Sequence, residues 1–170
     1  LDHVSLQVRR GEVHAICGEN GAGKSTLMKI LSGVYQPDAG ELEIAGRSVQ
    51  FNCTRDGEDA GVAIIHQELE LVEELSVAAN VFLGREPRTR FGLLDDAGAE
   101  RKTRELLALL ESAISPDDMT GDLRVGDQQL VEIAKALSLL ASIIVMDEPT
   151  SALTDAEACL LYTSDAADDP

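Results

Sequence analysis

The glycine-rich segment 18–26 constrains the fold of this chain more than any other stretch. It fits the pattern G-x-x-x-x-G-K-[ST] with Gly18, Glu19, Asn20, Gly21, Ala22, Gly23, Lys24, Ser25 and Thr26. A short apolar run, residues 13–17, precedes it, and apolar residues at helical spacing follow, so we expect a loop between a buried strand and a helix over 24–32. Glycines let successive main-chain N–H groups turn toward one phosphate chain, and the helix adds its positive end. The segment predicts a nucleotide-phosphate site; a purely structural glycine turn is the alternative.

Composition limits the class of protein. The chain has 170 residues, of which 44% are hydrophobic and 3% aromatic, so one domain with an aliphatic core is expected, as in a parallel sheet covered by helices. A net charge of −17 without a basic cluster disfavours direct binding to nucleic acid or to anionic lipid. The three cysteines show neither disulfide nor metal-ligand spacing, which favours a reducing cytosol. No apolar run is long enough to span a bilayer, and no signal peptide is evident.

The rest of the chain alternates between strand-like and helix-like patterns. Strands are predicted at 1–8, 13–17, 62–66 and 142–146, a hairpin at 41–51, and helices over 24–32, from Ser76, from Asp95 or Asp96, and over 125–140. Residues 71–138 contain no strand-like run. We therefore expect a helical subdomain at about 71–138, inserted into the sheet domain.

Two acidic residues follow the last apolar run of the sequence. Four apolar residues lead directly into Asp147 and Glu148. Because the carboxyl ends of parallel strands face the ligand crevice, Asp147 is a candidate for holding Mg²⁺ and Glu148 for polarising an attacking water. Strands that end in acids are common, so this pattern gains weight only beside the glycine loop.

With these segments in place, the chain resembles the ABC-type ATPases. The resemblance is carried by residues 126–129 (GDQQ) before a helix, residues 147–154 (DEPTSALT), Gln67 after an apolar strand, and the glycine loop, all in that family's order. It covers residues 1–158. Segments 64–69, 81–86 and 126–135 are most similar to the ATP-binding subunits of monosaccharide importers, which usually carry two such domains, and this chain resembles the first.

The resemblance implies an α/β P-loop NTPase fold with a parallel-sheet core, an antiparallel β subdomain and an inserted helical subdomain. It implies ATP and Mg²⁺ as cofactors, with Lys24 on the β- and γ-phosphates and Thr26 near the α-phosphate. Glu148 would be the general base, and Gln67 would contact Mg²⁺ or the lytic water. The implied metal ligands are Ser25, Gln67 and Asp147. The implied signature residues, which would bind ATP held by an opposing domain, are Arg124, Val125, Gly126 and Asp127.

The same resemblance implies a function and a set of partners. The chain would couple ATP hydrolysis to monosaccharide import through a separate membrane permease, with a second ATPase domain and, indirectly, a periplasmic sugar-binding protein. It would sit peripherally on the cytoplasmic face of the inner membrane, without inserting into it. The alternatives are a soluble ABC-type ATPase, another P-loop kinase or GTPase, and a nucleotide-binding regulatory module that does not hydrolyse ATP.

Three departures from the family pattern make us expect that the fragment alone is inactive. Arg124 stands where the signature normally has Ser and cannot supply a hydroxyl cap. The switch histidine after residue 154 and the adenine-stacking aromatic before Leu1 are missing. Residues 159–164 can be back-translated as TGT-CTC-TTA-TAC-ACA-TCT, which resembles the transposon end used in preparing sequencing libraries. We therefore expect 159–170 to be a non-native tail; a natural acidic tail is the alternative.

Overall fold

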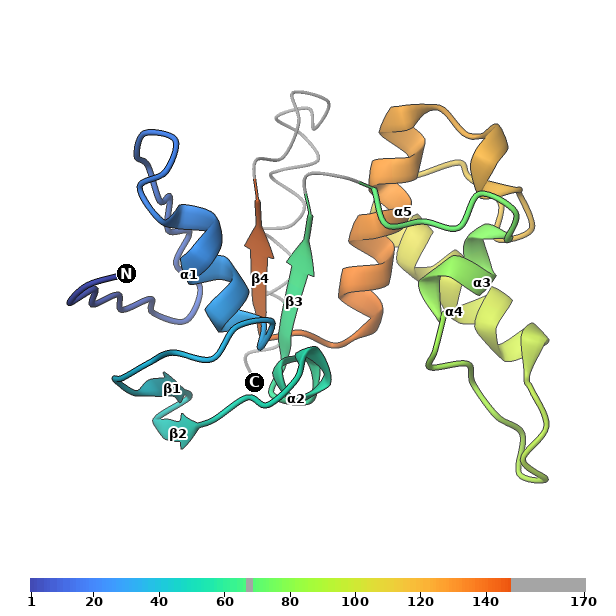
Figure 1. Ribbon diagram of the computed structural model, residues 1–170. Helices are drawn as coiled ribbons and strands as arrows, with labels where there is room; N and C mark the ends of the chain where they lie inside the picture. The colour runs from blue at the N-terminus through green and yellow to red at the C-terminus, as the bar shows by residue number, and fades with distance from the viewer. Residues whose placement is uncertain (67–68, 148–170) are drawn as a thin grey trace. The chain divides into compact units, whose positions relative to one another are not determined.

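The computed structural model describes residues 1–66 and 69–147, which divide after Val62 into two compact units (Figure 1). The first unit contains α1 (Lys24–Leu31), β1 (Leu42–Ile44), β2 (Arg47–Val49) and α2 (Thr54–Asp59). The second contains β3 (Val62–Ile65), which begins at the boundary, and α3 (Val77–Val81), α4 (Asp96–Leu109), the 3₁₀ helix η1 (Thr120–Asp122), α5 (Val125–Ser138) and β4 (Ile143–Met146).

The predicted hairpin is present in the first unit. β1 and β2 pair antiparallel, with Leu42 opposite Val49 and Ile44 opposite Arg47. The two residues between the strands, Ala45 and Gly46, have φ angles of 50° and 74°. Positive φ at both central positions is the requirement of the tight turn whose twist matches a two-stranded ribbon. The antiparallel β element of the first unit is therefore fixed by a local turn.

Helices α1 and α2 approach each other through two glycines. A Cβ atom on Gly33, which has a φ of 76°, would lie 2.5 Å from the main-chain oxygen of Cys53. A Cβ on Gly57 would lie 3.0 Å from the main-chain oxygen of Ser32. Side chains at either position would separate the two helices, so the glycines are required by close packing as well as by conformation.

Helix α2 was not predicted from the sequence. Its start is stabilised by the Asp56 carboxylate, which accepts the N–H of Asn52 at 2.7 Å and that of Cys53 at 3.3 Å. The Asn52 N–H is the main cause of the lowered pKa of Asp56. These bonds satisfy main-chain donors at the helix start, which allows a short helix with a glycine inside it to form.

The predicted strands at 1–8 and 13–17 are wrong for the chain as described. The structure assigns no strand to residues 1–23, and Val13 has 62% of its surface exposed. Among the described residues, the main-chain hydrogen bond of this stretch before the glycine loop is a turn from the Glu12 N–H to the Arg9 oxygen. An apolar, β-branched composition favours a strand only where a neighbouring strand supplies the ladder of hydrogen bonds.

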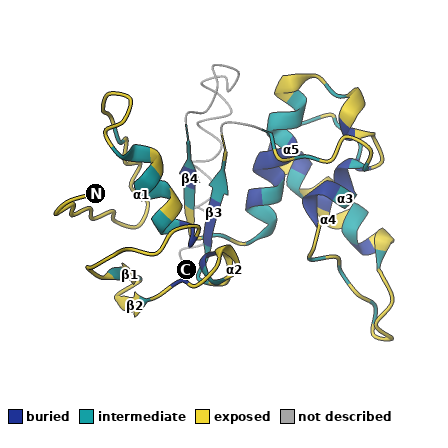
Figure 2. Cartoon of the chain, in the orientation of Figure 1, coloured by how far each residue is buried: buried dark blue, intermediate teal, exposed yellow. Residues whose placement is uncertain are grey.

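The sheet of the second unit joins segments far apart in sequence. β3 and β4 are neighbours and run in the same direction (Figure 1). The helices between them confirm the expected helical insertion: α3 packs on α4 and α5, and α4 packs on α5. Figure 2 shows that the faces of these helices that meet are buried. Val77, Val81, Leu107, Val131 and Ile133 form the fully buried part of this core.

The leucines at the end of α4 are not all buried. Leu107 and Leu110 are buried, but Leu109 is half exposed. Leu107 and Leu110 are three residues apart and lie on the same side of the helix, whereas Leu109, two residues after Leu107, lies on another side. Only part of the leucine cluster therefore contributes to the core.

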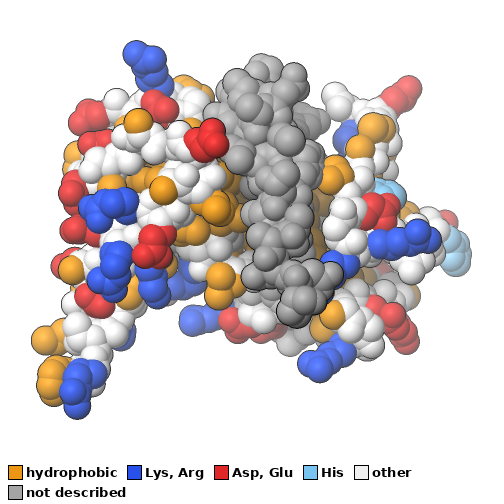
Figure 3. All heavy atoms as spheres, turned by 180° about the vertical axis from the view of Figure 1, so that it is seen from behind, with side chains coloured by type: hydrophobic (Ala, Val, Ile, Leu, Met, Phe, Trp, Pro, Cys, Tyr) orange, Lys and Arg blue, Asp and Glu red, His pale blue; other side chains and the backbone are white. Residues whose placement is uncertain are grey.

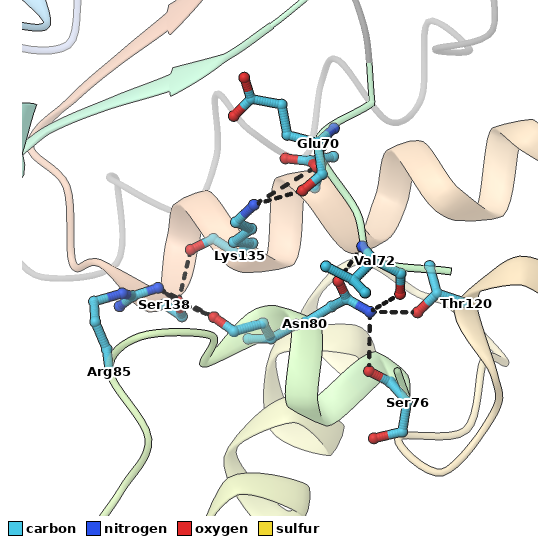
Figure 4. A network of polar contacts seen from close by, with 10 residues as sticks. Glu70, Val72, Ser76, Asn80, Arg85, Thr120, Lys135 and Ser138 are labelled. Carbon is cyan, nitrogen blue, oxygen red and sulfur yellow. Dashed lines mark hydrogen bonds and ion pairs between the residues drawn. The ribbon is translucent and has the colours of Figure 1, made fainter. Parts of the chain in front are cut away.

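Asn80 is the polar centre of the helical insertion, with 1% of its surface exposed. Its side-chain oxygen accepts the Val72 N–H at 2.8 Å. Its amide nitrogen donates to the main-chain oxygens of Val72 and Ser76 at 2.9 and 3.2 Å, and to Thr120 Oγ1 at 2.8 Å (Figure 4). One side chain on α3 thus fixes both the segment before that helix and the start of η1.

We expect Asn80→Ala to lower the free energy of unfolding by about 2 kcal/mol, because its partners lose a buried donor and acceptor at once. Gln50→Ala is the control, since the Gln50 side chain is exposed and makes no described hydrogen bond. Urea denaturation followed by circular dichroism measures both variants. Equal midpoints for the two would show that the Asn80 network contributes nothing to stability.

Candidate functional site

The glycine loop ends where α1 begins. Gly21 and Gly23 have φ angles of 85° and 95°, a region that favours glycine. The Ala22 N–H donates to the Glu19 oxygen at 3.1 Å, so the loop is a closed turn. Gly23 is the N-cap of α1, and Lys24 is the first helical residue. The expected loop-to-helix arrangement is present, although the expected strand before it is not.

The main-chain donors at this loop are left open. Gly23 has no side chain to cap α1, and no acceptor among the described residues takes the N–H groups of Gly23, Lys24 or Ser25. The Lys24 ammonium folds back over the loop and donates to the Gly18 oxygen at 2.7 Å and the Glu19 oxygen at 3.2 Å. Ser25 is exposed beside it. A cation and several free N–H groups in one place match the chemistry of a phosphate.

Asp147 lies at the carboxyl edge of the parallel pair in the second unit. Its N–H donates to the Ile65 oxygen at 3.1 Å, which places it beside the last residue of β3. Gln67 comes two residues after Ile65 in the sequence. Gln67 and Glu148 themselves lie outside the described residues. The structure therefore brings Asp147 next to the end of the strand that leads to Gln67.

The predicted signature residues form the first turn of α5. Arg124 is the N-cap residue, with φ −68° and ψ 155°, and its side chain makes no capping hydrogen bond. Val125 is 63% exposed, and a Cβ on Gly126 would meet nothing within 4 Å. Asp127 places a carboxylate in this turn. The Gln128 side-chain amide donates to the Thr120 main-chain oxygen at 3.0 Å, which holds this turn against η1.

Helix starts in this chain fall into two groups. The Ser76 hydroxyl accepts the Ala79 N–H at the start of α3, the Asp95 carboxylate accepts the Gly98 N–H at the start of α4, and Asp56 supports α2. The starts of α1 and α5 have no side-chain cap. These two are the helices that follow the predicted phosphate-binding loop and carry the predicted signature. Among the described α-helices, the starts without a supporting side chain are therefore the two that the sequence predicts to contact phosphate.

The loop 18–26 belongs to the first unit, whereas Asp147 and the signature residues belong to the second. Among the described residues, no group of three or more His, Cys, Asp or Glu side chains could hold a metal ion. In the first unit the Ser25 hydroxyl, and in the second unit the Asp147 carboxylate, each offers an oxygen of the kind that binds Mg²⁺, an ion usually held through one or two protein oxygens together with substrate phosphates and water.

Two residues that contact the main chain of Glu70 were not predicted from the sequence. Glu132 and Lys135, one turn apart on α5, both contact the main chain of Glu70. The available signal was a charged residue between Val131 and Ile133, on a stretch of helix that is otherwise apolar and buried. Periodicity alone did not single it out.

The surface carries mixed charges, and an apolar and basic tip lies on the loop between α3 and α4 (Figure 3). Phe91 is 81% exposed there, with the Arg90 guanidinium 5.3 Å from its ring centre.

No helix within the described ranges is both long and apolar enough to cross a membrane.

Comparison with known proteins decides the family. The model of the family described as "ABC transporter" matches residues 1–151. The chain belongs to the ABC transporter family. Among solved members, an ATP-binding cassette of an ABC transporter, MJ1267 in its ADP conformation, has a TM-score of 0.75 at 26% identity, covering 93% of this chain and 66% of that one. A nucleotide-free cassette has a TM-score of 0.77 at 24% identity, covering 95% and 67%, and supports the fold.

Curated relatives in this ABC family are more similar in sequence. "Ribose import ATP-binding protein RbsA" of Chromobacterium violaceum is 55% identical over 163 residues, 95% of this chain and 32% of the relative. A "Putative ribose/galactose/methyl galactoside import ATP-binding protein" of Hahella chejuensis is 48% identical over 162 residues, again 95% and 32%. The chain spans about a third of the length of these relatives.

The uncapped start of α5 gives a stability prediction. We expect Arg124→Ser to raise the free energy of unfolding by about 1 kcal/mol relative to Arg124→Ala, because only the hydroxyl can accept an N–H of the first turn. Both variants remove the same positive charge from the helix start, so Arg124→Ala controls for the helix dipole. Urea denaturation compares them. Identical stabilities would show that this turn has no donor for a cap to satisfy.

Proposed function

We propose that this chain is the first ATP-binding domain of an ABC importer that couples ATP hydrolysis to the uptake of a monosaccharide. The observation that carries the proposal is the pair of uncapped helix starts, at α1 and α5, in the two segments that would contact nucleotide phosphates. Side chains support the starts of the other α-helices in the described residues, α2, α3 and α4. A domain that binds phosphate at both places needs those donors free.

At the first place, the loop 18–26 would hold the phosphates of ATP. The Lys24 ammonium now shares two carbonyl oxygens of its own loop, and it would exchange them for the more strongly charged β- and γ-phosphate oxygens. Thr26 is half-buried in the first turn of α1, where it would lie near the α-phosphate. The open N–H groups of Gly23, Lys24 and Ser25 would complete the cradle.

Around the γ-phosphate, Ser25, Asp147 and Gln67 would hold Mg²⁺, which supplies charge neutralisation of the β- and γ-phosphates when bound. Glu148 would accept a proton from the attacking water as general base. Gln67 would orient that water and respond to the membrane partner. The bond from the Asp147 N–H to Ile65 supports this grouping, because it places Asp147 beside the strand that leads to Gln67.

At the second place, residues 124–127 would bind the γ-phosphate of ATP held by an opposing ATPase domain. The unobstructed space at Gly126 supports close approach of a phosphate to the main chain. Arg124 adds a positive charge there in place of a hydroxyl. We expect the Arg124 charge to favour phosphate binding. Because Arg124 would position the phosphate less tightly than a capping serine, we expect slow turnover at the ATP site that these residues complete.

The names of the relatives guide the choice of cargo and partners. The Chromobacterium protein is named for ribose import and the Hahella protein for ribose, galactose or methyl galactoside import. We propose a monosaccharide as cargo, with a membrane permease, a second ATPase domain and a periplasmic sugar-binding protein as the assembly. The domain would act peripherally at the cytoplasmic face of the inner membrane. Which sugar is carried would be set by the permease and the binding protein.

Binding of ATP tests the phosphate loop. We expect Lys24→Ala to weaken Mg–ATP binding about 10- to 100-fold, the loss of a charge-assisted bond of about 1.5–3 kcal/mol. Lys29→Ala is the matched control, since Lys29 lies on the same helix but its ammonium faces the Tyr35 ring at 5.5 Å. Isothermal titration calorimetry measures both. Equal affinities for the two variants would count against the phosphate assignment.

A further inference from the structure

The main chain of Glu70 is held from both sides by two side chains of α5. The Glu132 Oε1 atom accepts the Glu70 N–H at 3.0 Å. The Lys135 Nζ atom donates to the Glu70 carbonyl oxygen at 3.1 Å and lies 3.7 Å from Glu132 Oε1 (Figure 4). We call Glu132 and Lys135 the α5 clamp. It grips the donor and the acceptor of one residue, so it fixes the position of that residue without using its side chain.

The α5 clamp has a cost in stability, because it keeps a charged side chain inside the protein. Glu132 has 8% of its surface exposed and is the one buried charged residue in the described part of the chain. Burial raises the pKa of its carboxyl, and the nearby Lys135 ammonium only partly opposes that rise. Replacing a buried charge with an apolar residue of similar size is often neutral or stabilising. Packing of α5 alone would therefore be served as well by a leucine.

The α5 clamp joins two segments with different proposed functions, the helix α5 and the main chain at Glu70. α5 starts at the signature residues 124–127, and its clamp residues lie about two turns farther along the same rigid helix. Glu70 comes three residues after Gln67. The first turn of α5 would contact ATP of the opposing domain, whereas Gln67 would serve the ATP of this one.

We propose that Glu132 and Lys135 are positioning residues that link the signature helix to the segment following Gln67, and so couple the two ATP sites of the assembled importer. This inference rests on the proposed function. A displacement of α5 by phosphate at its start is carried to the Glu70 main chain through two hydrogen bonds. Without the clamp, ATP still binds to the loop 18–26, but the segment after Gln67 no longer follows the signature helix.

The test uses the full-length protein assembled with its permease. We expect Lys135→Met to lower kcat for ATP about 10- to 100-fold, the usual cost of a small misplacement near the reacting groups, with KM little changed. Lys135→Arg, which keeps a donor for the Glu70 oxygen, restores most of kcat. The matched control is Lys102→Met, because Lys102 is exposed on α4 and makes no described contact. The thermal unfolding temperatures of Lys135→Arg and Lys102→Met stay near that of the wild type. Lys135→Met unfolds at a lower temperature, because it leaves the buried Glu132 without its cation, so kcat is measured well below that temperature.

Glu132→Leu with hydrogen exchange gives a second readout that is independent of turnover. In this variant the Glu70 N–H has lost its hydrogen-bond acceptor. We therefore expect it to exchange about 10-fold faster, through local opening of the main chain around Glu70. An unchanged kcat in Lys135→Met, or an equal loss in Lys102→Met, overturns the clamp. So does an unchanged Glu70 exchange rate in Glu132→Leu. Failure of the proposed function differs from all of these, because there the wild-type assembly itself binds no ATP.

Discussion

Unsatisfied main-chain N–H groups at two helix starts are the constraint on which the rest of this structure depends. Every α-helix begins with donors that have no partner inside the helix, and proteins normally cover them with side chains. This chain does so at α2, α3 and α4 with Asp56, Ser76 and Asp95. At α1 and α5 it places a glycine and an arginine instead. The donors left open at these two starts are the ones that would bind phosphate in the proposed function.

Polar contacts elsewhere in the second unit hold the α5 helix in place. The Gln128 side chain ties its first turn to η1, and Asn80 ties η1 to the segment around Val72. Near its end, the Ser138 hydroxyl receives a hydrogen bond from Arg85 at 3.0 Å. An uncapped helix start is useful to a ligand only if the helix behind it does not move freely. The Gln128 and Ser138 contacts restrain α5 near both of its ends.

Elements that depend on contacts between residues close in sequence were predictable, whereas elements that depend on distant partners were not. Ser76, Asp95 and the Ala45–Gly46 turn act within a few residues, so the helices and the hairpin that they set were predictable. The strands at 1–8 and 13–17 depended on a pairing partner, which composition cannot supply. Helix α2 was missed because its stabilising residue, Asp56, lies inside a segment containing a glycine. Glu132 was missed because its partner, the Glu70 main chain, is 62 residues away in sequence. The glycine loop was predictable because its pattern is contained in nine consecutive residues, and the signature residues were named from the family resemblance; phosphate binding by both stays a prediction.

The most direct test of the account is an NMR titration of the ¹⁵N-labelled domain with Mg–ATP. The account predicts that the amide signals of Gly23, Lys24 and Ser25 shift on addition of nucleotide, because their N–H groups gain acceptors. The Gly126 amide should shift only when a second ATPase domain is added, since the phosphate it would contact is held by that domain. Shifts at Gly126 with the single domain, or none at residues 23–25, would contradict it.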